Sequence, residues 1–335
     1  MSEINTFRPA GLGYRIFNIN KTYLPMITTI IVFLIMYSFA CLSHPMFFSL
    51  RVFVNFLISN SFMGIIAMGM TFVIISGGID LSVGSMVGFI SIFSAYLITN
   101  LEIHPLSAIL ICLLFGAAFG YFQGFLIDRF GFAPFICTLA GLFFLRGSAY
   151  VVSLESIAIN HPTVDAITAF AIPLSQKISL PFTALVYLIV FLIMLILAGF
   201  STFGRNVYAI GDNENSAILM GIPVSSTKRK IYMLSGICSS LGGIVYALYT
   251  FSGYALAGSG LELDVIAAVV IGGTMLTGGI GFPVGTFVGV LIMGVIQTFI
   301  TFQGNLSSWW TKIMIGSLLF VFILLQNIFS KTAHK

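Results

Sequence analysis

The chain has 335 residues, of which 59% are hydrophobic and only 7% are charged. Because a water-soluble domain carries about a quarter charged residues, this composition excludes an ordinary soluble protein and indicates a polytopic membrane protein, with a single domain over 1–335. The net charge of +4 comes from basic residues spread between apolar blocks, which argues against nucleic acid as a partner. The four cysteines lie in apolar runs without metal-ligand spacing, so we expect neither a disulfide nor a metal site.

Apolar runs near the length of a bilayer crossing predict an all-α fold with about ten transmembrane helices, because open sheet edges cannot be satisfied in lipid. Residues 1–22 precede the first run and are expected to form a cytoplasmic N-terminal segment. The run at 263–277 is the weakest, since it is short and contains two glycines, and a half-membrane or broken helix is the alternative there. The predicted spans are 23–42, 56–76, 82–98, 106–127, 132–152, 180–199, 231–250, 263–277, 282–302 and 309–326.

The basic residues predict the orientation of these spans. An even number of spans places both termini on one side, and a cytoplasmic N-terminus leaves only Arg51 and Lys177 outside, so we expect both termini in the cytoplasm. Arg146 falls within the fifth span, where it would snorkel outward or pair with Glu155. The basic residues expected inside are Arg8, Arg15, Lys21, Arg129, Arg205, Lys228, Arg229, Lys230, Lys331 and Lys335.

Two loops are long enough to hold structure of their own. Residues 153–179, expected outside, are amphipathic and suit a short interfacial helix. Residues 200–230, expected inside, carry four basic and two acidic residues in a chain that has few of either. This concentration of charge favours a docking surface for a soluble partner, and a solvated loop whose basic residues only fix topology is the alternative.

A glycine-rich pattern occurs twice in the chain. "SGGIDLSVGSMVGFI" at 76–90 and "TGGIGFPVGTFVGVL" at 277–291 align without gaps and share seven residues. Each copy joins an inward-running span to an outward-running one, which predicts a parallel internal repeat. Chance similarity in a chain rich in glycine and valine is the alternative.

The first copy also contains the lone carboxylate of its region, Asp80. Its glycine pair is expected to end one helix, and Asp80 or Ser82 to cap the next. Because the second copy has a glycine in place of Asp80, a tight turn does not require the carboxylate, and ion pairing with a basic side chain of 200–230 is the alternative to capping. The predicted cytoplasmic turn consists of Gly77, Gly78, Asp80 and Ser82.

The sequence lacks recognisable catalytic and nucleotide-binding motifs. The sequence has no Gly-Lys-Ser/Thr nucleotide-binding element and no histidine cluster, so we expect a non-catalytic chain without cofactor or metal. Ionisable groups deep in the spans are almost absent, which argues against a proton-driven carrier. Uncharged polar residues do occur at depth, where they would line a path for a neutral, hydroxyl-rich solute or hydrogen-bond between helices. The candidates for such a path are Asn60, Gln123, Thr138 and Gln297.

Several segments resemble a known family. "GMTFVIISGGIDLSVGS" (69–85), "PFICTLAGLFFLRG" (134–147) and "FGRNVYAIGDNENSAILMGI" (203–222) resemble the ribose-type permeases of ABC sugar importers. A second set of segments is similar to permeases of the bacterial galactofuranose importer. This set comprises "ESIAINHP" (155–162), "SGYALAGSGLELDVIAAVVIGGTMLTGGIG" (252–281) and "LSSWWTKI" (306–313).

The resemblance implies a multi-pass subunit of the bacterial inner membrane that works with a second permease, a cytoplasmic ABC ATPase and a periplasmic sugar-binding protein. The chain would pass a monosaccharide, galactofuranose by the second set of segments, to the cytoplasm by alternating access. The alternative is an ATP-independent secondary sugar carrier or facilitator. By the same resemblance residues 200–230 are a coupling loop, although Asp212 stands where the family commonly has glycine. The residues implied to contact the ATPase are Arg205, Tyr208, Gly211, Asn213, Ala217 and Gly221.

Overall fold

The computed structural model describes residues 23–175, 178–304, 306–307 and 309–333, with the side chains of 327–333 left aside. The expected cytoplasmic segment 1–22, Lys177 and the last two residues lie outside this part. The described α-helices are α1 (Leu24–Ser43), α2 (Leu50–Ser59), α3 (Ser61–Ile75), α4 (Val83–Thr99), α5 (Pro105–Phe130), α6 (Pro134–Val152), α7 (Pro162–Ala169), α8 (Phe182–Phe200), α9 (Thr202–Asp212), α10 (Glu214–Leu219), α11 (Val224–Thr250), α12 (Leu261–Ile271), α13 (Pro283–Gln303) and α14 (Trp309–Ala333).

Each of the ten predicted spans contains a helix, but not every helix can cross a membrane. In the described residues seven helices are long and apolar enough, and α2 with α3 makes an eighth only if the pair, bent by 62°, is one span. The helix α4 has 17 residues and α12 has 11, against about 20 for a full crossing. The run at 263–277 is therefore a half-length helix followed by a loop, because Gly272 and Gly273 (φ +88°) end it.

The core consists of helices that are apolar on all sides. Nearly every residue of α3 and α4 is buried, as expected of a helix without a polar face. The helix α11 packs along both and along α5. Gly116, Gly120 and Gly124 of α5 meet the backbone of α11 at Gly236, Tyr232 and Arg229, so these small residues let the two helices approach closely.

Short strands lie at one end of the molecule. A 3₁₀ turn, η2 (Pro45–Phe47), follows α1. Strands β1 (Ile157–Ala158) and β4 (Ser252–Gly253) pair antiparallel, as do β2 (Ala171–Ser175) and β3 (Ile178–Pro181). The fold is thus not purely α-helical as predicted, because these strands lie in the connections between the long helices, where the lipid constraint on open edges is relaxed.

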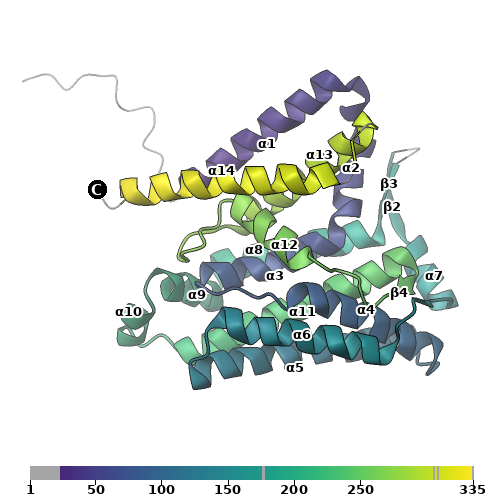
Figure 1. Cartoon of the computed structure of the whole chain (residues 1–335), viewed down its shortest axis with the longest axis horizontal. Helices are drawn as coiled ribbons and strands as arrows, with labels where there is room; N and C mark the ends of the chain where they lie inside the picture. The colour runs from purple at the N-terminus through teal and green to yellow at the C-terminus, as the bar shows by residue number, and fades with distance from the viewer. Residues whose placement is uncertain (1–22, 176–177, 305, 308, 334–335) are drawn as a thin grey trace, which may run out of the picture.

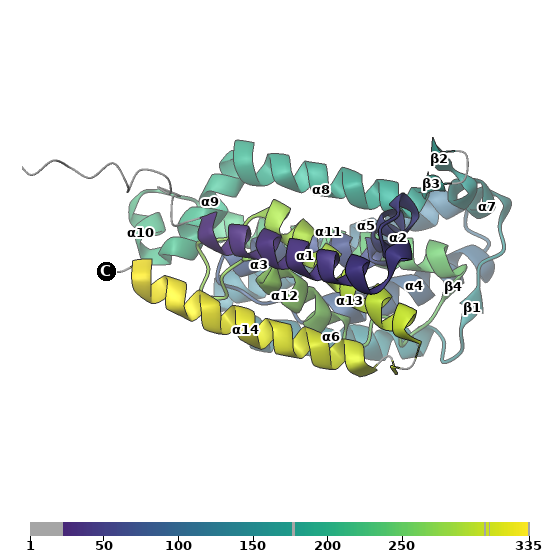
Figure 2. The ribbon, with the colours of Figure 1, turned by 90° about the horizontal axis from the view of Figure 1, so that it is seen from above.

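The connections gather at two opposite ends of the bundle. Figures 1 and 2 both show α9 and α10 at one end, where α14 also ends, and α7 with the strands at the other. The helix α7 lies in the loop 153–179, for which a short helix was expected. The loop 200–230 instead folds into α9, α10 and the first turns of α11, so its charges sit on a defined helical tip.

Candidate functional site

The residues 200–230 form short helices because each start has its own cap. The Ser201 hydroxyl accepts a hydrogen bond from Gly204 N–H (2.9 Å) at the start of α9, and Asn213 Oδ1 accepts one from Ser216 N–H (2.8 Å) at the start of α10. Gly221 adopts φ +76° between α10 and α11, a left-handed conformation that suits glycine. Asn213 and Gly221 therefore shape this tip, whatever else they contact.

The folded segment 200–230 carries an exposed apolar surface. Ala217 is fully buried in a small cluster with Ile210 and Val224, so its side chain cannot touch a partner directly. The three residues that follow it, Ile218, Leu219 and Met220, are 55%, 87% and 67% exposed. We call these three residues the α10 tip. Contiguous exposed apolar residues outside the spans are typical of an interaction surface.

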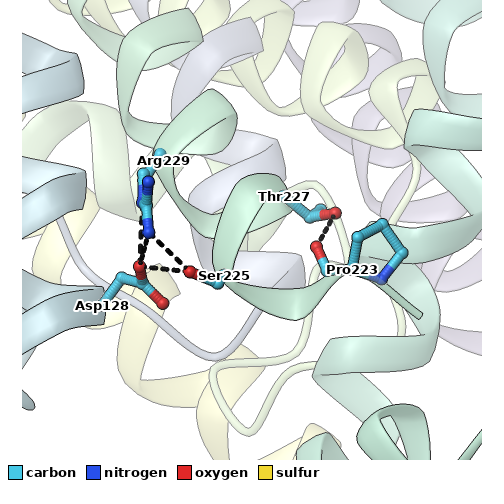
Figure 3. Close-up of polar contacts among 5 residues, drawn as sticks. All are labelled: Asp128, Pro223, Ser225, Thr227 and Arg229. Atoms are coloured by element: carbon cyan, nitrogen blue, oxygen red, sulfur yellow. Dashed lines mark hydrogen bonds and ion pairs between the residues drawn. The ribbon is translucent and has the colours of Figure 1, made fainter. Parts of the chain in front are cut away.

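Charged side chains join the segment 200–230 to the helix bundle. Lys228 Nζ lies 2.7 Å from Glu214 Oε1, which joins α11 to α10. Figure 3 shows Arg229 reaching Asp128 at the end of α5, with Nε–Oδ2 2.8 Å and Nη2–Oδ2 2.7 Å. Ser225 donates to the same carboxylate. These basic residues of the predicted docking loop thus hold α5, α10 and α11 together.

The end of α9 contacts both copies of the glycine-rich repeat. The Tyr208 hydroxyl donates to the carbonyl of Gly281 (2.7 Å) in the second copy. A Cβ at Gly211 would collide with the carbonyl of Ile75, the residue just before the first copy, and would lie 2.6 Å from Gly279 N in the second. Only a glycine lets α9 come this close. Burial raises the pKa of Tyr208 to about 12.

The two repeated turns also contact each other. Gly279 N–H donates to the carbonyl of Ile75 (2.9 Å), and the aligned residues Gly77 and Gly278 have φ of +80° and +85°. The helices that follow, α4 and α13, begin at nearly equivalent positions of the repeat. The last turn of α9 is therefore seated on a pair of adjoining, similarly shaped turns.

Asp80 lies in the first of these turns and is 2% exposed. Its Oδ1 accepts from Ser82 N–H (2.9 Å) and Ser82 Oγ (2.6 Å), and its Oδ2 accepts from Ser235 Oγ of α11 (2.7 Å). Ser82 is the residue that precedes α4, and no side-chain cap bond is found there, so the predicted cap by Asp80 or Ser82 is absent and Asp80 instead holds Ser82 itself. No ion pair to Asp80 is found in the described residues, so the alternative role, pairing with the 200–230 loop, is absent too. Three donors satisfy this carboxylate instead.

Two of the four candidate path residues join this buried polar group. Gln123 Oε1 lies 3.2 Å from Ser82 Oγ, whose single proton is donated to Asp80, and Thr138 Oγ1 lies 3.2 Å from the carbonyl of Ile79. Asn60 lies elsewhere, at the bend between α2 and α3, where it donates to the Phe56 carbonyl (3.1 Å). Gln297 is on α13, where its backbone carbonyl accepts from Thr301 Oγ1 (2.9 Å).

Sequence reasoning missed Ser235 and Tyr232 of α11. The Tyr232 hydroxyl is buried beside Gly78 without a hydrogen-bond partner in the structure. The only available signal was the presence of polar residues inside an apolar span, which several other residues share.

Comparison with known proteins identifies the chain. The family model described as branched-chain amino acid transport system, permease component, matches residues 52–323, more than half of the chain. The chain belongs to this permease family. Together with its membrane-crossing helices, this makes it a multi-pass permease of the inner membrane, as predicted.

Similar proteins are permeases along nearly their whole length. The inner membrane ABC transporter permease protein YjfF of Escherichia coli (strain K12) is 53% identical over 92% of this chain and 93% of that protein. The ribose import permease protein RbsC of Bacillus subtilis (strain 168) is 35% identical over 85% and 87%, and the fructose import permease protein FruG of Bifidobacterium longum (strain NCC 2705) is 32% identical over 93% of each. The family description names amino acids, whereas two of these three relatives are named for sugars and the name of YjfF specifies no solute. No solved structure matches the permease.

Proposed function

We propose that this permease is the membrane-spanning subunit of an ATP-driven importer of a monosaccharide. It works with a second permease, a cytoplasmic ABC ATPase and a periplasmic sugar-binding protein, and it opens alternately to each side of the membrane. The relatives named as ribose and fructose import permeases support a sugar as the solute. The chain itself performs no bond chemistry in this proposal.

One observation carries the coupling to a motor: the helices that bear the exposed α10 tip are seated on both repeated turns. An ATPase that binds Ile218, Leu219 and Met220 and moves them would displace α9. Because α9 is in direct backbone contact with both turns at Gly211, the turns would move with it. The excess of basic residues at this end, including Arg129, supports its cytoplasmic location. In this proposal Arg205, Tyr208, Gly211, Asn213, Ala217 and Gly221 shape or transmit the contact.

The proposed sugar is galactofuranose. The support is the similarity of residues 155–162, 252–281 and 306–313 to permeases of the galactofuranose importer. In the structure two of these segments meet, because β1 pairs with β4. Ribose and fructose, the sugars named for the relatives, are the comparison arms of the test.

Uptake into proteoliposomes tests the proposal. The permease is reconstituted with its second permease and binding protein, with and without the ATPase, and uptake of labelled D-galactose, D-ribose and D-fructose is measured with internal or external ATP. We expect uptake only when ATPase and ATP are present, with D-galactose, which supplies a furanose fraction, preferred. Undiminished uptake without the ATPase would establish a secondary carrier or facilitator instead.

A further inference from the structure

A non-helical segment, 254–260, lies along one face of α4. Tyr254 N–H donates to Ser91 Oγ (3.3 Å), and a Cβ on Gly88 would lie 2.7 Å from the carbonyl oxygen of Ala255. Further along, the backbone of Gly258 is equally close to Gly84. The small residues of α4 therefore admit an irregular backbone between β4 and α12. Irregular backbone at membrane depth is tolerated where it is covered by protein or lines a water-filled cavity.

Arg146 of α6 stabilises this segment. Its Nη1 donates to the carbonyls of Ala255 (2.6 Å) and Ala257 (3.1 Å), so it neither snorkels outward nor pairs with Glu155. Since α6 continues for six residues beyond Arg146, the guanidinium lies roughly 9 Å inside the end of that helix. An arginine at such a depth is expected to face the protein or water and not lipid.

Glu262 projects onto the same face of α4. It lies in the first turn of α12, its side chain contacts Gly84, and its Oε2 is buried without a hydrogen-bond partner in the structure. Arg146 lies against Gly88, one turn from Gly84, so the two charged groups are separated by roughly 6 Å along α4. The three ion pairs of the described residues all lie elsewhere.

Partly exposed residues lie near this pair, beside an apolar face of α6 on which Phe143, Phe144 and Val151 are 67%, 62% and 88% exposed. Tyr150 and Tyr254 are 37% and 39% exposed, and nothing lies within 4 Å of a Cβ at Gly147. Lys312 of α14 pairs with Asp264, two residues beyond Glu262. A charge facing lipid at mid-membrane costs about 2.5–3.5 kcal/mol, so Arg146 and Glu262 are expected to face water or protein.

We propose that Arg146 and Glu262 form a subsite that binds a hydroxyl group of the transported sugar, an inference that rests on the proposed function. A hydroxyl group is both donor and acceptor, so one such group can donate to Glu262 Oε2 while accepting from Arg146. Hydrogen bonds to charged partners are the stronger ones. A site built to bond a hydroxyl also rejects the analogue that lacks it, because the buried charges are then left unpaired.

The test compares Glu262→Gln with wild type in the reconstituted four-component transporter. Uptake is measured for whichever of D-galactose, D-ribose and D-fructose the wild type transports, and for its monodeoxy analogues. We expect Glu262→Gln to lower uptake at least tenfold and to abolish the wild-type discrimination against one deoxy analogue. Glu102→Gln, an exposed acid outside the spans, is the matched control and should retain both uptake and discrimination. ATPase stimulation by the binding protein should survive in both variants.

Gly147→Cys gives a second measurement that does not disturb the charged pair. The transported sugar should slow the labelling of this thiol by a water-soluble maleimide in the intact complex. Unchanged uptake and analogue discrimination in Glu262→Gln, or labelling of Gly147→Cys that the sugar does not slow, would overturn the subsite. Wild-type uptake that needs no ATPase would overturn the proposed function by itself, and absence of uptake of all three sugars would overturn both.

Discussion

At the scale of single residues, a buried carboxylate without a basic partner organises the first repeated turn. Asp80 accepts three hydrogen bonds, and Ser235 supplies the one that crosses from α11. Such donors offset the cost of burying a charged group, and losing one leaves a carboxylate oxygen uncompensated. The turn is thereby tied to the helix that continues directly from the α10 tip.

Ser235→Ala is expected to destabilise the protein by about 1–3 kcal/mol, because Asp80 Oδ2 loses its donor. The measurement is thermal unfolding of the purified complex in detergent. Ser239→Ala is the matched control, since Ser239 is equally buried on the same helix but its hydroxyl has no partner in the structure. An equal loss in the two variants would refute a role for the Asp80 hydrogen bond.

Tyr208→Phe removes the hydrogen bond to the Gly281 carbonyl and is expected to cost about 0.5–1.5 kcal/mol. Burial raises the pKa of Tyr208 from 10.0 to about 12, so the neutral hydroxyl is favoured in the folded state. The raised pKa adds stability that is fully present below pH 10 and is lost as the pH rises from 10 towards 12. The stability difference between wild type and Tyr208→Phe should therefore be constant from pH 6 to about 9.5. A difference that falls already near pH 8 would contradict this.

Residue identity alone predicted part of this chemistry. The glycine pair Gly77–Gly78 was expected to end a helix, and α3 does end just before it, with Gly77 at φ +80°. Neither expected role of Asp80, a cap on α4 or an ion pair with 200–230, is found in the described residues. The contacts of Asp80 with Ser235 and of Tyr208 with Gly281 join residues 155 and 73 positions apart. Local sequence carries no information about which of many buried serines and carbonyls will meet across helices.

At the scale of elements, the position of α9 depends on a glycine in its last turn. Gly211 has no side chain, so the last turn of α9 touches the carbonyl of Ile75 and the amide of Gly279. The repeat could be found in the sequence because its glycines recur at equal spacing. The two copies meet beneath α9 because α3, α12 and α13 pack against one another. No local sequence pattern predicts this packing.

Gly211→Ala is expected to separate α9 from both turns and to lower the number of sugars transported per ATP hydrolysed, because the added Cβ overlaps the Ile75 carbonyl. Uptake and ATPase activity are measured on the same proteoliposomes. Gly199→Ala near the end of α8 is the control, since its Cβ would meet nothing within 4 Å and helical alanine is favoured over glycine. If Gly211→Ala transported with the wild-type ratio, α9 would not transmit movement to the turns.

The lengths of the elements were the weakest part of the sequence prediction. Hydropathy marks where apolar residues are, but a buried half-length helix such as α12 is as apolar as a full crossing. The bend between α2 and α3 lies at Asn60, which sequence reasoning assigned to a solute path. Ten apolar runs therefore gave the order of the helices correctly, and seven or eight helices of the described residues are long and apolar enough to cross.

At the scale of the whole molecule, the proposed function requires that the α10 tip lie in the cytoplasm and contact the ATPase. Charge counting predicted this side, and Figure 1 places α9, α10 and the end of α14 together at one end of the bundle. The opposite end carries α7 and the paired strands. The predicted orientation in the membrane rests on the distribution of basic residues, which can be read from the sequence without a structure.

The most direct test of this claim is the labelling of a thiol at the tip. Leu219→Cys is introduced after replacing Cys41, Cys112, Cys137 and Cys238, and a membrane-impermeant maleimide is added to intact cells and to inverted membrane vesicles. The account predicts no labelling in intact cells, rapid labelling in vesicles stripped of the ATPase, and protection when the ATPase is restored. Labelling of Leu219→Cys from outside intact cells, or labelling that the ATPase leaves unchanged, would contradict it.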